Sequence, residues 1–326
     1  MLDTDTFLTE LYVMCDDFCK TRPALAACPG AKPSLCPSEV LTLCIFGQWR
    51  NFASERDFYR YAQRHLRPAF PTLPDRAQFN RLERACYCDL VAFWQHLTRE
   101  LKPDEPGSYY EALDATGVAT RHVSRRGSGW LQGQADKGLA SRLGWYTGFY
   151  LLASADSCGV FTGFGFGPAS CKDQPLAEVF LQARAHPDHP DHPDARLPTA
   201  GDALPEDGFY LTDSGFQGRE LHLHWLHDYR AEVITPPQRV GGPGKKPWIV
   251  PWKDSGLRHW IASLRQIIET AFGKLHHVFR LRDERPHTLE GFMTRLAAKI
   301  TLHNFCIFLN RKHARPNLAF ADLWSW

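Results

Sequence analysis

A change in hydrophobic pattern near residue 103 separates two parts of the chain with different expected secondary structure. From Asp3 to about Lys102, apolar residues recur at the three- and four-residue spacing of helices. The segment 103–107, P-D-E-P-G, ends this pattern, because proline lacks an N–H group and restricts the residue before it. After it, short aromatic and β-branched runs alternate with glycine, as in strands. We therefore predict an N-terminal all-helical domain over residues 1–104 and an α/β domain over residues 105–326.

The first part contains clear helix starts. Ser38 and Ser54 each precede a helical run, and serine is a preferred N-cap residue. Prolines between residues 68 and 74 then predict a turn, after which the helical pattern resumes over Arg76–Leu101. This part is expected to be a bundle of short helices.

The second part alternates strand-like and helix-like segments. Three strand candidates come first, and helices and strands then alternate, which favours a mixed α/β sheet flanked by helices. The predicted strands are Tyr109–Leu113, Trp145–Ala155, Gly159–Phe166, Gly208–Thr212 and Ala231–Thr235, and the predicted helices are Pro175–Ala185 and Arg219–His227.

Composition limits the class of protein without naming its partner. With 326 residues and 44% hydrophobic content, the chain can bury a large core, and its formal net charge of +2 excludes neither nucleic acid nor an acidic substrate. No apolar run reaches the roughly 20 residues that cross a bilayer. The first twenty residues carry four aspartates where a signal peptide would be basic, so we expect a cytoplasmic protein.

The ten cysteines form no C-x-x-C pair. Many lie in apolar, helical text, and reduced core thiols are the favoured interpretation over disulfides. These include Cys44, Cys86, Cys88 and Cys306.

Two aspartates follow predicted strands. Asp114 is expected to end the strand Tyr109–Leu113, and Asp213 follows Gly208–Thr212 and leads into a glycine-rich turn. Strand ends in α/β sheets are where functional sites form. Taken singly, each aspartate is more often a turn former or a helix cap, because its side chain accepts hydrogen bonds from nearby backbone N–H groups.

Glu269 lies in the most amphipathic segment of the chain. Arg265 and Glu269 are on the polar side of this predicted helix, and an exposed i, i+4 ion pair is the alternative to a functional role. The predicted buried stripe consists of Leu257, Ile261, Leu264, Ile268, Phe272 and Leu275.

Three carboxylates on two strands and one helix suit a two-metal site. Two divalent cations about 3.5–4 Å apart activate the attacking oxygen and stabilise the leaving oxygen of a displacement. Carboxylate oxygens are hard ligands that favour Mg²⁺ or Mn²⁺. We expect two such ions per active site.

Five stretches carry a family resemblance. They are L-C-P-S-E-V-L-T-L (35–43), A-L-D-A-T (112–116), L-T-D-S-G-F-Q-G (211–218), R-Q-I-I-E-T-A-F-G-K-L (265–275) and R-L-A-A-K-I-T-L-H-N (295–304). Over almost its whole length, the chain resembles the DDE transposases of bacterial insertion sequences, whose catalytic core is RNase H-like. The resemblance implies that Asp114, Asp213 and Glu269 are catalytic metal ligands and that Arg265 assists them.

The resemblance also implies an activity and partners. Such an enzyme cleaves double-stranded DNA at the terminal inverted repeats of the element and joins the 3′ ends to target DNA, as a homodimer associated with the bacterial nucleoid. The N-terminal domain would recognise the repeats. A metal-dependent nuclease on the same fold and a transposase-derived DNA-binding protein without catalysis remain as alternatives.

Basic residues near these motifs are candidates for phosphate contacts. Charge clusters of this kind are also commonly just solvated surface. The predicted DNA-binding residues are Arg121, Arg125, Arg126, Lys245, Lys246, Arg280 and Arg282.

Overall fold

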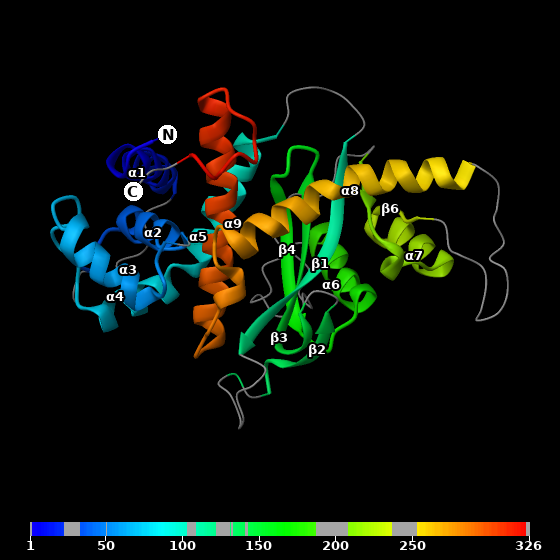
Figure 1. Ribbon diagram of the computed structural model, residues 1–326, viewed down its shortest axis with the longest axis horizontal. Helices are drawn as coiled ribbons and strands as arrows, with labels where there is room; N and C mark the ends of the chain where they lie inside the picture. Colours follow the sequence, from blue (N-terminus) through cyan, green and yellow to red (C-terminus); the bar gives the residue numbers. More distant parts are fainter. Residues whose placement is uncertain are drawn as a thin grey trace. The chain divides into compact units, whose positions relative to one another are not determined.

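The chain forms two compact units (Figure 1). The computed structural model describes residues 2–22, 33–49, 51–102, 109–121, 131, 133–140, 143–186, 208–236 and 253–323. Unit 1 comprises Met1–Leu101, Ser128–Leu131 and Lys274–Trp326, and unit 2 comprises Lys102–Gly127 and Gln132–Gly273. The division at residues 104 and 105 lies outside the described residues and stays a prediction, while residues 274–326 belong to the same compact unit as the N-terminal helices.

Unit 1 is helical. Ser54 caps α3 by accepting a hydrogen bond from the backbone N–H of Asp57, as its sequence predicts, and Asp75 caps α4. The helical pattern over Arg76–Leu101 is divided between two helices, because the backbone leaves helical geometry at Cys86. The elements are α1 (Thr4–Thr21), α2 (Pro37–Phe46), α3 (Glu55–Tyr61), the π-helical turn η1 (Ala62–Leu66), α4 (Arg76–Ala85), α5 (Tyr87–Glu100), the 3₁₀ turn η3 (Leu281–Asp283) and α9 (Leu289–Lys312).

Helix α9 is the centre of unit 1. Its middle is buried on all sides, including the polar residues Lys299, His303 and Asn304. A helix buried all round is typical of the core of a bundle. Phe305 of α9 packs edge-on against Phe7 of α1, with ring centroids 5.4 Å apart. The C-terminal segment thus completes the core of the N-terminal helices.

Unit 2 is built on a six-stranded mixed sheet. The main order is β2-β3-β1-β5-β6. β2 pairs with the first part of β3, and β4 pairs with the rest of β3. β3 pairs antiparallel with β1, β2 and β4, while β1, β5 and β6 are parallel. This confirms the predicted mixed α/β class, although β2 was not predicted. The strands are β1 (Tyr110–Arg121), β2 (Asp136–Ala140), β3 (Gly144–Asp156), β4 (Phe161–Pro168), β5 (Phe209–Leu211) and β6 (Glu232–Ile234).

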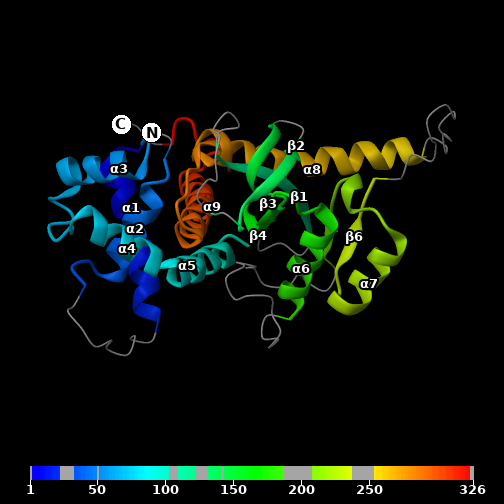
Figure 2. The ribbon, with the colours of Figure 1, turned by 90° about the horizontal axis from the view of Figure 1, so that it is seen from below.

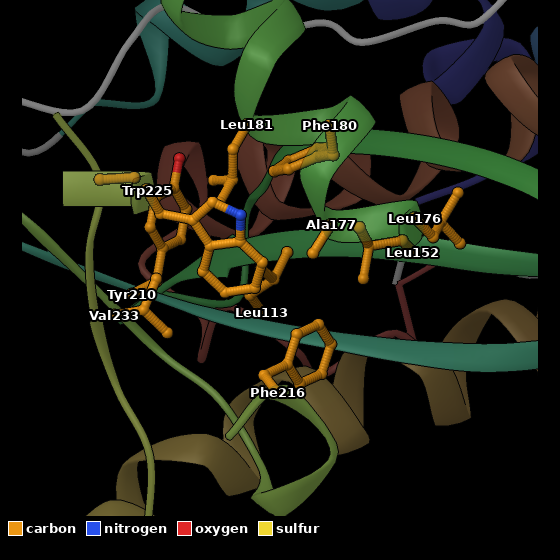
Figure 3. Packing of buried hydrophobic residues seen from close by; sticks show 11 residues of the cluster. Leu113, Leu152, Leu176, Ala177, Phe180, Leu181, Tyr210, Phe216, Trp225 and Val233 are labelled. Atoms are coloured by element: carbon orange, nitrogen blue, oxygen red, sulfur yellow. The ribbon is translucent and has the colours of Figure 1, made fainter. Parts of the chain in front are cut away.

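Helices cover both faces of this sheet (Figure 2). Helices α6 (Asp173–Ala185) and α7 (Arg219–Tyr229) lie on one face. Their contact with the sheet is a hydrophobic core around Trp225, which is fully buried (Figure 3). This core includes Leu113, Leu152, Leu176, Phe180, Tyr210, Phe216 and Val233.

Helix α8 (Lys253–His277) crosses the other face within unit 2 (Figure 2). Ile261 and Ile268 are fully buried, and Phe272 packs against Phe161 of β4 with centroids 6.0 Å apart. Leu257, predicted to belong to the buried stripe, is 40% exposed, because it lies in the first turns of the helix. The stripe that holds α8 on the sheet therefore begins at Ile261.

None of the helices among the described residues is long and apolar enough to cross a membrane. The nine cysteines in the described part are all free thiols, as predicted. Cys44, Cys86 and Cys306 are buried, whereas Cys88 is exposed.

Candidate active site

Asp114 and Asp213 occupy matching positions on neighbouring parallel strands. The pairing of β1 with β5 ends at Ala112 and Leu211, and each aspartate lies two residues beyond that pair. The prediction that Asp114 ends its strand is wrong, because β1 continues to Arg121 by pairing with β3. Neighbouring strands are only about 4.8 Å apart, so their shared register brings the two carboxylates to one place.

The loop that carries Asp213 is held from two sides. Asp213 Oδ1 accepts a hydrogen bond of 2.7 Å from the N–H of Gly215, which forms the 3₁₀ turn η2 (Ser214–Phe216). Gln174 of α6 donates through Nε2 to the carbonyl oxygens of Gly215, at 3.1 Å, and of Gln217, at 2.8 Å. Phe216 is fully buried in the core beneath. These contacts fix the backbone next to the carboxylate.

Helix α8 brings a basic and an acidic group to the same place. Arg265 Nη2 lies 3.0 Å from Asp114 Oδ2, and the two side chains are only 13% and 18% exposed. Glu269, one turn later on α8, is exposed. The spacing of four residues puts Arg265 and Glu269 on one side of the helix. Arg265 therefore extends from α8 to Asp114 on the sheet. Glu269 lies on the same side of the helix and is more exposed to solvent.

The electrostatics show that the three acids interact. Burial, together with the negative charges of Asp213 and Glu269, raises the pKa of Asp114 to about 6 against the opposing effect of Arg265. Like charges held together disfavour ionisation of a carboxyl group. Perturbed acids of this kind cluster at functional sites. The site therefore carries an excess of negative charge that Arg265 only partly balances.

The donor set suits a hard divalent cation, although the acids are not in ligating geometry. Among the described residues, no three His, Cys, Asp or Glu side chains are close enough to enclose a metal ion. The carboxylate oxygens of Asp114, Asp213 and Glu269 are nevertheless the ligands that Mg²⁺ and Mn²⁺ prefer. A cation would also relieve the repulsion that raises the pKa of Asp114.

Sequence reasoning missed a fourth carboxylate. Asp173, the first residue of α6, accepts a hydrogen bond of 2.7 Å from the Tyr150 hydroxyl. A Cβ atom added to Gly215 would lie 2.5 Å from Asp173 Oδ2 and 2.9 Å from Asp213 Oδ1, so the two acids flank this glycine. Burial raises the pKa of Asp173, and the charge of Asp213 adds to the effect. In the sequence, Asp173 shows only the pattern of an acidic first helical turn.

The predicted DNA-binding residues divide into three groups. Arg121, at the end of β1, is partly exposed, and Arg282 is exposed. Arg280 is buried, with 9% of its surface exposed. The remaining four lie outside the described residues: Arg125, Arg126, Lys245 and Lys246. Contact of any of them with DNA stays a prediction.

A comparison with protein families shows the family to which the chain belongs. Residues 111–305 match the model described as the transposase DDE domain. The chain belongs to this transposase family. The match spans more than half of the chain and contains Asp114, Asp213, Arg265 and Glu269. No curated protein and no solved structure matches the chain significantly. Membership of a transposase family implies that the substrate is DNA.

Proposed function

We propose that this member of the transposase DDE family is an active DNA transposase that cleaves at the terminal inverted repeats of its element and joins the 3′ ends to target DNA. The matching register of Asp114 and Asp213, with Arg265 of α8 bonded to Asp114, is the observation that carries the proposal. It puts an excess of carboxylate oxygens where β5 ends beside the longer strand β1.

In this proposal, Asp114, Asp213 and Glu269 hold two divalent cations, Mg²⁺ or Mn²⁺. When bound, such ions activate the attacking oxygen and stabilise the leaving oxygen of an in-line displacement at phosphorus. Asp114 and Asp213 present their oxygens from the sheet, and Glu269 presents its own from α8. Arg265 orients the Asp114 carboxylate and offsets part of its charge. No covalent protein intermediate is needed.

DNA is held by basic residues outside this group of acids. Arg121 and Arg282 are accessible for phosphate contacts, and we propose the same role for the predicted positions outside the described residues. The helical region 1–104 recognises the inverted repeats, and the active form on DNA is a homodimer.

The substitution Asp213→Asn tests the catalytic assignment. Asparagine retains an oxygen that can accept the hydrogen bond from Gly215 N–H, so the loop should stay folded while a charged metal ligand is lost. We expect cleavage of DNA that carries the element's ends to fall more than about 100-fold in Mg²⁺, since even outer-shell changes cost 10–100-fold. DNA binding should persist.

The control is Asp136→Asn, which removes an exposed carboxylate from β2 of the same unit. It should cleave like the unmodified protein. Joined products in the unmodified protein support a transposase, whereas cleavage without joining supports the nuclease alternative. Binding with neither reaction would support a non-catalytic DNA-binding protein. Full activity of Asp213→Asn would overturn the metal-ligand assignment.

A further inference from the structure

Unit 1 contains a second charged site, separate from the carboxylates of unit 2. A cavity of about 530 Å³ is lined by residues of α3, α4, η3 and α9 and of the segments beside them. All of its lining residues belong to unit 1. Six arginines line it: Arg56, Arg76, Arg84, Arg280, Arg285 and Arg295.

Arg280 is the most unusual of these arginines. Its backbone is left-handed, with φ 55° and ψ 34°, a conformation that costs a non-glycine residue about 1 kcal/mol or more. Its side chain is nine-tenths buried, yet its Nε atom has no hydrogen-bond partner in the described structure. Both features are unfavourable: backbone strain of this kind clusters at functional sites and ligand clamps, and a buried donor without a partner is a position where a bound ligand can accept a hydrogen bond.

The acidic residues of the cavity do not cancel its positive charge. Glu284 is paired with Lys299 at 3.0 Å and with Arg295 at 2.8 Å, and Arg295 also binds Glu55. Burial and the charge of Glu55 raise the pKa of Glu83 to about 8, so Glu83 is largely protonated at neutral pH. Asp283 is the one further carboxylate among the lining residues, so the remaining five arginines are in excess.

Five arginines keep their charge available. Within the described part of the chain, none of them forms an ion pair, and all except the buried Arg280 are exposed to solvent. They are Arg56, Arg76, Arg84, Arg280 and Arg285. Guanidinium groups bind phosphate through two parallel N–H donors, which makes a phosphate-bearing ligand the best chemical match.

We propose that this cavity binds the phosphates of one or two consecutive nucleotides of a DNA strand. Its volume is within the range of pockets that enclose a ligand of that size. DNA, rather than another phosphate ester, is chosen because of the proposed function, on which this inference rests. The site anchors the strand independently of the carboxylates that carry the chemistry.

The test measures the binding of a short, fluorescein-labelled single-stranded oligonucleotide by fluorescence anisotropy. EDTA is present throughout, so that metal ions at the carboxylates of unit 2 do not contribute to binding. The variant Arg76→Gln with Arg84→Gln removes two exposed charges from the cavity. Arg60→Gln with Arg64→Gln is the matched control, because both of these arginines are exposed in unit 1 and neither lines the cavity. We expect the cavity variant to bind about fivefold or more weakly at physiological salt, and the slope of log K against log salt to fall by about 0.7 per lost contact.

Equal losses in the two double variants, or none in either, would overturn the proposal. Arg280→Gln should weaken binding similarly, with thermal unfolding confirming that it folds. Inorganic phosphate is added as a competitor: if it displaces the oligonucleotide at equal concentration, the cavity is the site of an adventitious ion only, and the proposal fails. Cleavage in Mg²⁺ is measured separately, so retained cleavage by Asp213→Asn with weakened binding by the cavity variant would refute the catalytic assignment alone.

Discussion

Each unit contains a group of acidic and basic side chains with buried members, but the charges are matched around Glu284 in unit 1 and unmatched around Asp114 in unit 2. In unit 1, Glu284 is 5% exposed and has two cationic partners, Lys299 and Arg295, which outweigh burial and hold its pKa at about 2. In unit 2, burial and two anionic neighbours outweigh the one cationic partner of Asp114, Arg265, and raise its pKa to about 6. Matched charges stabilise a fold, whereas an unmatched excess indicates a place where a ligand supplies the missing charge.

The largest expected effect on stability comes from breaking the matched group. Glu284→Gln removes the anionic partner of Lys299, which is fully buried. The free energy of unfolding should therefore fall by about 3–5 kcal/mol. Urea denaturation measures this change. Asp213→Asn removes a carboxylate from the unmatched group and should change stability by less than about 1 kcal/mol. If both variants lost similar stability, the contrast between the two groups would be wrong.

The second prediction is that stability depends on pH through the carboxyl group of Asp114. The pKa of Asp114 is raised from 3.8 in the unfolded chain to about 6 in the folded one, so the folded protein binds more protons between these values. Its contribution to stability should therefore fall by about 2 kcal/mol as the pH rises from 4 to 6, out of about 3 kcal/mol over the full titration. Glu284 has the opposite sign, because its lowered pKa makes folding more favourable as the pH rises from about 2 to 4.5.

Denaturation in EDTA across this pH range, with Asp114→Asn as the reference, isolates the slope due to Asp114. Mg²⁺ should flatten the slope in the unmodified protein and leave the variant unchanged. Identical pH profiles for the two proteins would show that Asp114 is not the perturbed acid.

The third prediction tests how closely the acids of unit 2 are packed. In Gly215→Ala, the new Cβ would lie 2.5 Å from Asp173 Oδ2 and 2.9 Å from Asp213 Oδ1, so the loop must move. We expect a loss of about 1–3 kcal/mol in stability and a fall in cleavage, because Asp213 moves with the loop. Gly273→Ala, in α8 with open space around it, should instead stabilise by about 0.5–1 kcal/mol. Unchanged cleavage by Gly215→Ala would mean that the position of Asp213 is not critical.

The sequence predicted the local parts of this site better than the long-range ones. Asp213 was found because a strand-like run leads into a glycine-rich turn, a signal contained within a few residues. Asp114 was selected because its strand was predicted to end there, and that prediction is wrong. Asp114 lies beside Asp213 because β1 is in register with β5, almost a hundred residues later in the chain. Arg265 was assigned to the polar side of α8, but its bond to Asp114 depends on how that helix crosses the sheet.

Contacts between distant segments leave no periodic trace in a single sequence. Asp173 meets the Asp213 loop only because α6 folds back on the sheet, and Glu55 meets Arg295 across 240 positions. The same reason explains why α9 was not expected in the unit of the N-terminal helices. Periodicity predicts which face of an element is buried, but not which other element covers that face.

The smallest expected effect concerns Asp173, the fourth carboxylate, and tests how it acts on the three predicted ones. Tyr150→Phe removes the hydroxyl that donates to Asp173 at 2.7 Å and leaves the ring in place, so stability should fall by only about 1 kcal/mol. Because Asp173 adjoins the Asp213 loop, cleavage should fall about tenfold, as for the loss of a group that orients a metal ligand.

Asp173→Asn should reproduce this loss, and the double variant should be no worse than either single one if the two residues act through the same contact. Tyr146→Phe is the control, since its hydroxyl donates to the carbonyl oxygen of Phe149 instead. Additive losses in the double variant would mean that Tyr150 and Asp173 affect the site separately. In that case Asp173 would belong with the three acids as part of the charge excess rather than with the contacts that hold them.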